Sequence, residues 1–245
     1  MMVFKADLHI HTVLSPCGSL EMSPAQIVKS AVENQIDIIG ITDHNSTRQC
    51  RTVISEAQKA GITVYCGAEV TTKEEVHCLA FFEDIETLDK FQLYLDQYLP
   101  EIQNNPDLFG YQVVVNESED IIFEEERLLI SAISRNINQV EEEVHRLKGI
   151  FIPAHVNKTK YSLVSQLGFI PPDLKFDALE LSKHMETGTF LKSFPYLKNA
   201  TILHNSDAHQ PEYIGTIYTE LLMESTDFKE FRLALKNSEG RMVIK

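Results

Sequence analysis

Residues 36–66 read IDIIGITDHNSTRQCRTVISEAQKAGITVYC, and this stretch decides the fold class. Its first part, Ile36 to Thr42, is a short apolar run typical of a strand buried in a parallel sheet. Residues 48–60 fit a helix that ends at Gly61, because glycine readily adopts the left-handed conformation found after helices. Residues 62–66 form the next apolar run. A strand, a helix and a second strand in this order predict a βαβ unit.

The same alternation continues on both sides of this unit. Upstream, Val3 to His11 reads as a strand, and a helix is expected from Pro24 to about Asn34, with Ser23 as its cap. Downstream, strands are expected at 76–82, 149–154, 177–181, 200–203, 215–222 and 242–244, and a helix at 228–237. The chain is therefore predicted to be an α/β protein built around a parallel sheet.

Residues 84–147 depart from this rhythm. A helix is expected at 85–103, a hairpin at 111–124, and two further helices before Gly149. The apolar residues of this segment are few and local, so they do not predict a separate core. We expect a single domain over residues 1–245, in which 84–147 is an insertion or cap.

Charge and composition limit the partners. The chain has 245 residues, enough for one large domain, and a formal net charge of −14. Such a charge repels polyanions, and nucleic-acid-binding proteins usually carry a basic face, so we expect no duplex DNA or RNA partner. A small phosphorylated substrate remains compatible with this charge, because bound metal ions would reverse the local sign.

Cysteine usage and hydropathy give an expectation about location. The four cysteines form no CxxC pair, and no stretch approaches the roughly 20 apolar residues that cross a bilayer. The N-terminal residues also lack the apolar region of a secretory signal. We therefore expect a cytoplasmic protein with no membrane partner.

Titratable side chains gather where the predicted strands end. His9 and His11 stand two apart on a strand, so they point to the same face, and imidazole is a common ligand of zinc and iron. The other candidates at or beside strand ends are His44, Glu69, His77, His155, Asp207 and His209. Each of these residues alone has an ordinary structural explanation, such as a histidine bonded within the core or a carboxylate that caps a helix.

The set as a whole predicts a metal centre. The carboxyl ends of parallel strands in a barrel converge on one face, where active sites form. Six imidazoles and two carboxylates gathered there would repel one another or stay unpaired without cations. Metal ions resolve this conflict.

The motifs resemble those of the PHP family, named for polymerase and histidinol phosphatase. They are DLHIHT at 7–12, TDHN at 42–45, GAE at 67–69, PAH at 153–155 and SDAH at 206–209. The resemblance covers nearly the whole chain and is weakest over the middle segment. It implies a distorted (β/α)7 TIM-like barrel with the metal site at the C-terminal ends of the strands.

The resemblance also implies two or three divalent ions, zinc, iron or manganese. One ion would be held by His9, His11, Glu69 and Asp207. A second would be held by His77 and His155, with Glu69 as a bridge, and a third would involve His44 and His209.

Cys17 departs from the family pattern. It stands six residues after His11, where some relatives place a histidine. A thiolate ligand favours a softer ion such as zinc, and we expect Cys17 to be a ligand. The alternative is a small buried residue, with the third ion weak or absent.

Other residues are expected to support the site. Asp7 and Asp43 are candidates for carboxylates that accept the second N–H of a ligating imidazole, although loop capping is nearly as good an explanation. Arg48, Lys158 and Lys183 are candidates for phosphate contacts, against the alternative of solvated surface charges. His184 is a candidate for substrate contact.

These residues predict a metal-dependent phosphoesterase that hydrolyses a small phosphorylated metabolite or nucleotide by a metal-activated hydroxide. Asp207 or His209 would transfer the proton. The alternatives are exonuclease-like hydrolysis of oligonucleotides and a non-catalytic, metal-binding regulatory domain. The negative charge favours a small substrate, because a groove that follows a single strand is normally basic.

Overall fold

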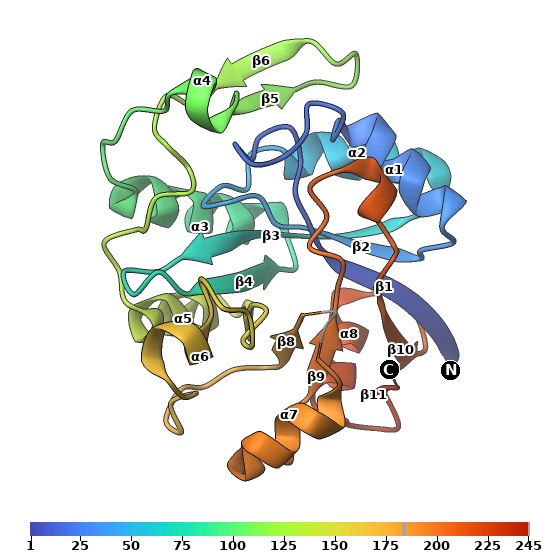
Figure 1. Cartoon of the computed structure of the whole chain (residues 1–245). Helices are drawn as coiled ribbons and strands as arrows, with labels where there is room; N and C mark the ends of the chain where they lie inside the picture. The colour runs from blue at the N-terminus through green and yellow to red at the C-terminus, as the bar shows by residue number, and fades with distance from the viewer. Residues whose placement is uncertain (183–184, 245) are drawn as a thin grey trace.

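A curled sheet of seven strands forms the centre of the molecule (Figure 1). The structure is a computed structural model, and it describes residues 1–182 and 185–244. Lys183 and His184, both predicted to contact substrate, lie outside the described residues. The sheet has the order β11-β10-β1-β2-β3-β4-β7, and β5-β6 and β8-β9 form two separate pairs. The predicted α/β class is confirmed.

The strands are β1 (Met2–Ile10), β2 (Ile38–Ile41), β3 (Thr63–Thr71), β4 (His77–Phe82), β5 (Val113–Val115), β6 (Ile121–Glu124), β7 (Ile150–Pro153), β8 (Leu179–Leu181), β9 (Ile202–His204), β10 (Thr219–Met223) and β11 (Met242–Val243). The α-helices are α1 (Pro24–Glu33), α2 (Cys50–Ala60), α3 (Ile85–Tyr98), α4 (Pro106–Phe109), α5 (Ile137–Arg146), α6 (Leu163–Leu167), α7 (Thr187–Ser193) and α8 (Phe228–Leu235). Two 3₁₀ turns are η1 (Pro195–Leu197) and η2 (Pro211–Tyr213).

The first βα units form as their sequence predicts. Ser23 accepts a hydrogen bond from the Gln26 backbone at the start of α1, and Pro24 occupies the first turn. Helix α2 ends at Gly61, whose φ of 73° is left-handed. Strand β2 is buried throughout and lies parallel between β1 and β3.

Strand β4 differs from the prediction of a parallel sheet. It runs antiparallel to both β3 and β7, because the short turn between Thr71 and His77 leaves no room for a crossover helix. Strands β10 and β11 also pair antiparallel. The curled sheet agrees with the expected distorted, TIM-like barrel, but its antiparallel strands do not form seven βα units. The reversal has one consequence for function, since it places His77, the first residue of β4, opposite Thr71 at the far end of β3.

The segment 84–147 also differs in detail. Helix α3 ends at Tyr98 and not at Gln103, because Pro100 disfavours helical backbone at Leu99. The hairpin β5-β6 forms as predicted. Between this hairpin and Gly149 the structure has one helix, α5, where two were expected. The loop before α5 is stabilised by side-chain hydrogen bonds, such as the one that Gln112 accepts from the Leu129 N–H.

Two large buried clusters hold most of the described elements together, and a small third one packs Val113 and Val115 of β5 against Val13. One large cluster lies mainly between the sheet and helices α1, α2, α3 and α5, so α3 and α5 of the middle segment share the main core. The other large cluster joins Leu8 and Leu79 of the sheet to Phe231 of α8. The hairpin β5-β6 and α4 lie together at one end of the molecule (Figure 1). Among the described helices, none has the length and apolar character needed to span a bilayer.

Candidate metal centre

A single buried carboxylate, Glu69 of β3, lies at the centre of the site. Its side chain is 1% exposed. Imidazole nitrogens from five segments lie within 3.4 Å of its two oxygens: His9 Nε2 at 3.3 Å, His11 Nε2 at 3.4 Å, His44 Nδ1 at 3.1 Å, His77 Nδ1 at 2.8 Å and His155 Nε2 at 3.1 Å. The structure therefore brings together side chains from β1, from β4 and from the loops after β1, β2 and β7.

Asp207 completes this group from the loop after β9. Its Oδ1 lies 3.4 Å from His9 Nε2, 3.5 Å from His11 Nε2 and 3.7 Å from His209 Nδ1. Asp207 and His155 have φ values of 54° and 28°, in the left-handed region that residues with a side chain rarely adopt. Such backbone strain is tolerated where the surrounding structure fixes it, commonly at functional sites.

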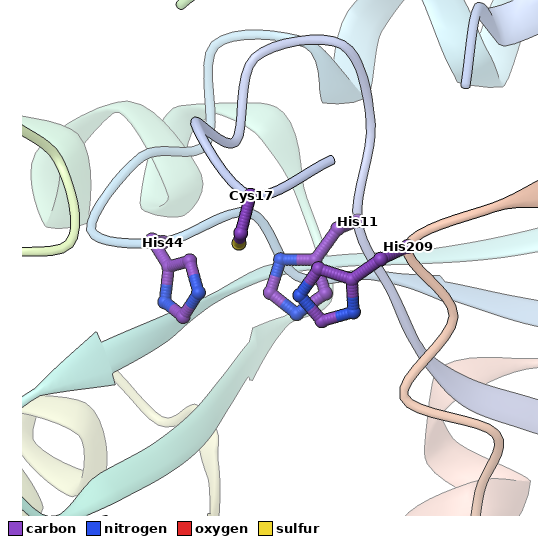
Figure 2. A group of neighbouring side chains, drawn as sticks. All are labelled: His11, Cys17, His44 and His209. Carbon is purple, nitrogen blue, oxygen red and sulfur yellow. The ribbon is translucent and has the colours of Figure 1, made fainter. Parts of the chain in front are cut away.

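A second cluster lies beside the first and shares His11 and His44 with it. One ligand atom each from His11, Cys17, His44 and His209 lies within 4.8 Å of the others. Figure 2 shows the Cys17 sulfur pointing toward the three rings. The loop that carries Cys17 turns tightly at Gly18, where a Cβ would lie 2.5 Å from the Thr12 carbonyl oxygen.

Electrostatics inside the site favour the ligand forms of the two carboxylates and of His44, His155 and His209. Burial opposes charge on Glu69 and Asp207, but the surrounding histidines hold the pKa of both carboxyls well below the usual range. Burial lowers the pKa of His44 well below its ordinary value and that of His209 to about 4. Neutral imidazole and ionised carboxylate are the forms that bind metal. At His9 and His11 burial opposes the charge, but the neighbouring carboxylates raise the pKa above its ordinary value, and burial raises the pKa of the Cys17 thiol.

The orientation of the rings fits divalent cations. Among the described residues, His155 Nδ1 is buried without a hydrogen-bond partner, and His44 Nδ1 points at Glu69 without forming a hydrogen bond. Nε2 of His9 and Nε2 of His11 face each other at 3.2 Å. Imidazole, carboxylate and one thiol are the donor types that bind zinc, iron and manganese.

Glu180 of β8 is a site residue that the sequence prediction missed. His9 Nδ1 lies 3.1 Å from each of its oxygens, and Glu180 also accepts the His155 backbone N–H and the Asn205 amide. With Nδ1 bound in this way, the His9 Nε2 lone pair faces Glu69 and Asp207. A signal was available, because Glu180 interrupts the apolar run of a predicted buried strand.

The prediction that Asp7 and Asp43 accept a hydrogen bond directly from an imidazole was wrong. Asp7 accepts the backbone N–H groups of Ser206 and Gly215, which is the alternative role of loop capping. Asp43 accepts the Ser15 hydroxyl at 2.7 Å, and Ser15 Oγ lies 2.9 Å from His11 Nδ1. Asp43 therefore acts on His11 through Ser15.

The predicted phosphate-binding cations lie in different places. Lys158 Nζ contacts Asp207 Oδ2; burial opposes its charge, but Asp207 raises the pKa of the lysine above its ordinary value. Arg48 is turned away to Asp96, at 2.8 Å, and to the ring of Phe123. Of the two that the structure describes, Lys158 is the one that lies at the site, where it lines a cavity of about 370 Å³.

Comparison with known proteins identifies the family. A model of the PHP domain matches residues 7–157, and a model described as PHP-associated matches residues 199–239. The chain belongs to the PHP domain family. The resemblance drawn from the motifs is thus confirmed. The two matched regions together hold every predicted ligand, whereas Glu180 lies between them.

Several proteins resemble this PHP domain over nearly its full length. The uncharacterized protein YqxK of Bacillus subtilis is 26% identical over 98% of the chain and 63% of its own length. The lesion-specific endonuclease Q of Pyrococcus furiosus matches at a TM-score of 0.76 and 21% identity, over 99% of this chain and 58% of its own. A putative metal-dependent phosphoesterase of Bifidobacterium adolescentis matches at 0.60 and 18%, over 95% and 96%. The chain thus spans about three fifths of the length of the first two relatives.

Proposed function

We propose that this PHP domain hydrolyses phosphoester bonds at the cluster centred on Glu69. The observation that carries the proposal is the convergence of five imidazoles on this buried carboxylate, with Asp207 beside them. We propose that two or three divalent ions, zinc, iron or manganese, are held by His9, His11, Cys17, His44, Glu69, His77, His155, Asp207 and His209.

The chain's own residues have separate roles in this proposal. Divalent ions at such a site supply a water of lowered pKa and neutralise phosphate charge. Lys158 adds a cation on the rim, next to Asp207, where a phosphate oxygen would lie. Asp207 would transfer the proton to the leaving oxygen through Oδ2, the carboxylate oxygen that faces Lys158; His209 would take this role where the third ion is absent.

Size and charge favour a small phosphorylated metabolite or nucleotide as substrate. The cavity of about 370 Å³ is within the range of sites that bind a small molecule. The net charge of −14 disfavours a long polyanion at physiological salt.

Cleavage of a DNA strand is the second candidate. It is favoured by the likeness to endonuclease Q, which has been seen in complex with a 27-mer duplex that carries an abasic lesion. This likeness weakens the expectation that duplex nucleic acid is no partner.

The test is elemental analysis of the purified protein, followed by a phosphoester panel assayed with the metal found. His9→Ala and Asp207→Ala should each lower kcat/KM by at least about 100-fold, because each removes a proposed ligand. His145→Ala is the matched control, since this histidine is bonded to Glu141 and Asp177 away from the cluster. Full activity in both ligand variants would refute the site.

A further inference from the structure

Two cavities adjoin the Lys158–Asp207 ion pair. One, of about 370 Å³, also reaches His77 and Tyr161, and the other, of about 350 Å³, reaches Ser182 and Tyr213. Four residues line both cavities: His155, Lys158, Asp207 and His209. A phosphate seated at these four residues would therefore have room for one substituent in each cavity.

The first cavity offers a flat aromatic wall. The ring of Tyr161 is stacked on His77, with centroids 4.8 Å apart and planes within 12°. Tyr161 is 45% exposed and lines this cavity, so part of its side chain is accessible to a bound molecule. The backbone of Tyr161 is strained, with a φ of 55°. The hydrogen bond from the His77 N–H to the Tyr161 carbonyl stabilises this conformation. A planar ring of a substrate can stack on an accessible aromatic ring.

The second cavity has a different lining. Beside the shared residues it is lined by carboxylate, amide and hydroxyl side chains: Glu180, Ser182, Asn205, Ser206 and Tyr213. Of these, Asn205 and Glu180 are bonded to each other. The hydroxyl groups suit a substituent rich in hydroxyls, such as a sugar.

We propose that the bond hydrolysed is a phosphodiester, with a planar heterocyclic ring stacked on Tyr161 on one side and a hydroxyl-bearing group in the second cavity. This inference rests on the proposed function and narrows its substrate to small diesters that contain a nucleoside. A terminal phosphate monoester has one substituent and would use one of the two cavities.

The reaction balances with water alone. The water oxygen forms a new bond to phosphorus while one of the two ester P–O bonds breaks. The departing oxygen takes up a proton and leaves as an alcohol, and the phosphate stays on the other fragment as a monoester. Lys158 lines both cavities, where it would contact a non-bridging phosphate oxygen throughout.

The first experiment compares matched esters with the full chain and its native metal. The probes are the p-nitrophenyl ester of thymidine 5′-monophosphate, glycerophosphoglycerol, which is a diester without a planar ring, and p-nitrophenyl phosphate. We expect kcat/KM for the thymidine diester to exceed that for the monoester by at least tenfold. Equal or faster hydrolysis of the monoester would overturn the diester inference alone, whereas hydrolysis of none of the three would overturn the proposed function itself.

The second experiment tests the stacking role of Tyr161. Tyr161→Ala should raise KM for the thymidine diester about tenfold, as the loss of one base–aromatic stack does. It should leave KM for glycerophosphoglycerol, which has no ring to stack, within about twofold. Tyr161→Phe should restore the low KM, because it keeps the ring.

Two controls separate stacking from damage to the site. Metal content should be unchanged in both Tyr161 variants, which shows that His77 stays in place. Tyr111→Ala removes a tyrosine of similar exposure that lines neither cavity, and it should have no effect on KM. An equal rise in KM for both diesters in Tyr161→Ala, or no rise for either, would contradict the assigned ring contact.

Discussion

At the scale of single residues, Glu180 decides which nitrogen of His9 faces the cluster. Both of its oxygens lie 3.1 Å from His9 Nδ1, and it also accepts the backbone N–H of His155. One carboxylate thus fixes two proposed ligands from different strands. Because its side chain is 2% exposed, water cannot take over these bonds.

We predict that Glu180→Gln lowers metal affinity about 10- to 100-fold, because an amide is a weaker and differently directed partner for the His9 N–H. Competition with a chromophoric chelator would measure the affinity. Glu230→Gln is a suitable control, since Glu230 is a buried carboxylate bonded to Arg241 outside the site. Equal affinity in the Glu180 variant and the wild type would count against its orienting role.

Cys17 is the residue that decides the character of the proposed third site. If its sulfur is a ligand together with His11, His44 and His209, Cd²⁺ bound there should give the ultraviolet band of a metal–thiolate bond. We predict that Cys17→Ser removes this band and about one equivalent of bound metal. The other three cysteines are buried in the core and should not contribute. A band that persists in Cys17→Ser would exclude this ligand.

At the scale of elements, strand β4 supplies a proposed ligand although it runs opposite to the parallel strands. In a parallel strand, a ligand at this edge of the sheet would stand at the carboxyl end. In β4 it stands at the amino end, where His77 is paired opposite Thr71 of β3. Antiparallel pairing therefore delivers His77 to Glu69 at 2.8 Å.

A histidine also ties helix α5 to the strand that carries Glu180. His145 Nδ1 lies 2.5 Å from Glu141, and its Nε2 lies 3.1 Å from Asp177, which precedes β8. The hydrogen bond to Asp177 raises the pKa of His145 above its ordinary value, and the bond to Glu141 adds to this rise. Burial of the ring opposes the rise in part. The folded protein thus holds the imidazolium more tightly than the unfolded chain does.

The sign of the resulting pH dependence follows from linkage. A raised pKa in the folded state gives stabilisation that is fully present below the unfolded value of 6.5 and is lost as the pH rises through the folded value. We predict that His145→Asn lowers the free energy of unfolding by about 0.5–1 kcal/mol near pH 6, a small value because the ring is partly exposed to solvent. Urea unfolding from pH 6 to pH 9 would show the difference from wild type shrinking; a difference that grows with pH would contradict the assignment.

At the scale of the whole molecule, the site links segments that lie far apart in the sequence. Leu8 donates to Asn205 across 197 residues, and His9 is bonded to Glu180 across 171. Ions held by the proposed ligands would therefore bind the folded state and not the unfolded chain. Metal binding and global stability should be coupled.

We predict that removing metal with a chelator lowers the midpoint of thermal unfolding by about 5–10 °C. A ligand at 100 times its dissociation constant stabilises the folded state by roughly 2.7 kcal/mol. For a chain of this size, each kcal/mol shifts the unfolding midpoint by about 2–4 °C. Calorimetry with and without added metal would measure the shift. The double variant His9→Ala/Asp207→Ala should show no metal-dependent shift, and a shift as large as in wild type would place the stabilising ions elsewhere.

The sequence by itself determined the α/β class, the elements around the first βα units and the position of most proposed ligands. These follow from local rules, because an apolar run such as Ile38–Ile41 needs burial on both faces and a glycine such as Gly61 ends a helix. Pairs such as His9 and His11 were visible because the two-residue period of a strand sets their common direction.

Only the tertiary structure decided the pairing of β4 with β7, the role of Glu180, and the location of Lys158 at the site and of Arg48 away from it. Each of these depends on a partner distant in sequence: β7 for β4, His9 for Glu180, and Asp207 or Asp96 for the two cations. The pairing of distant strands and the partner of a buried charge are set by which segments pack together. That packing is a property of the whole chain, and no local pattern of residues specifies it.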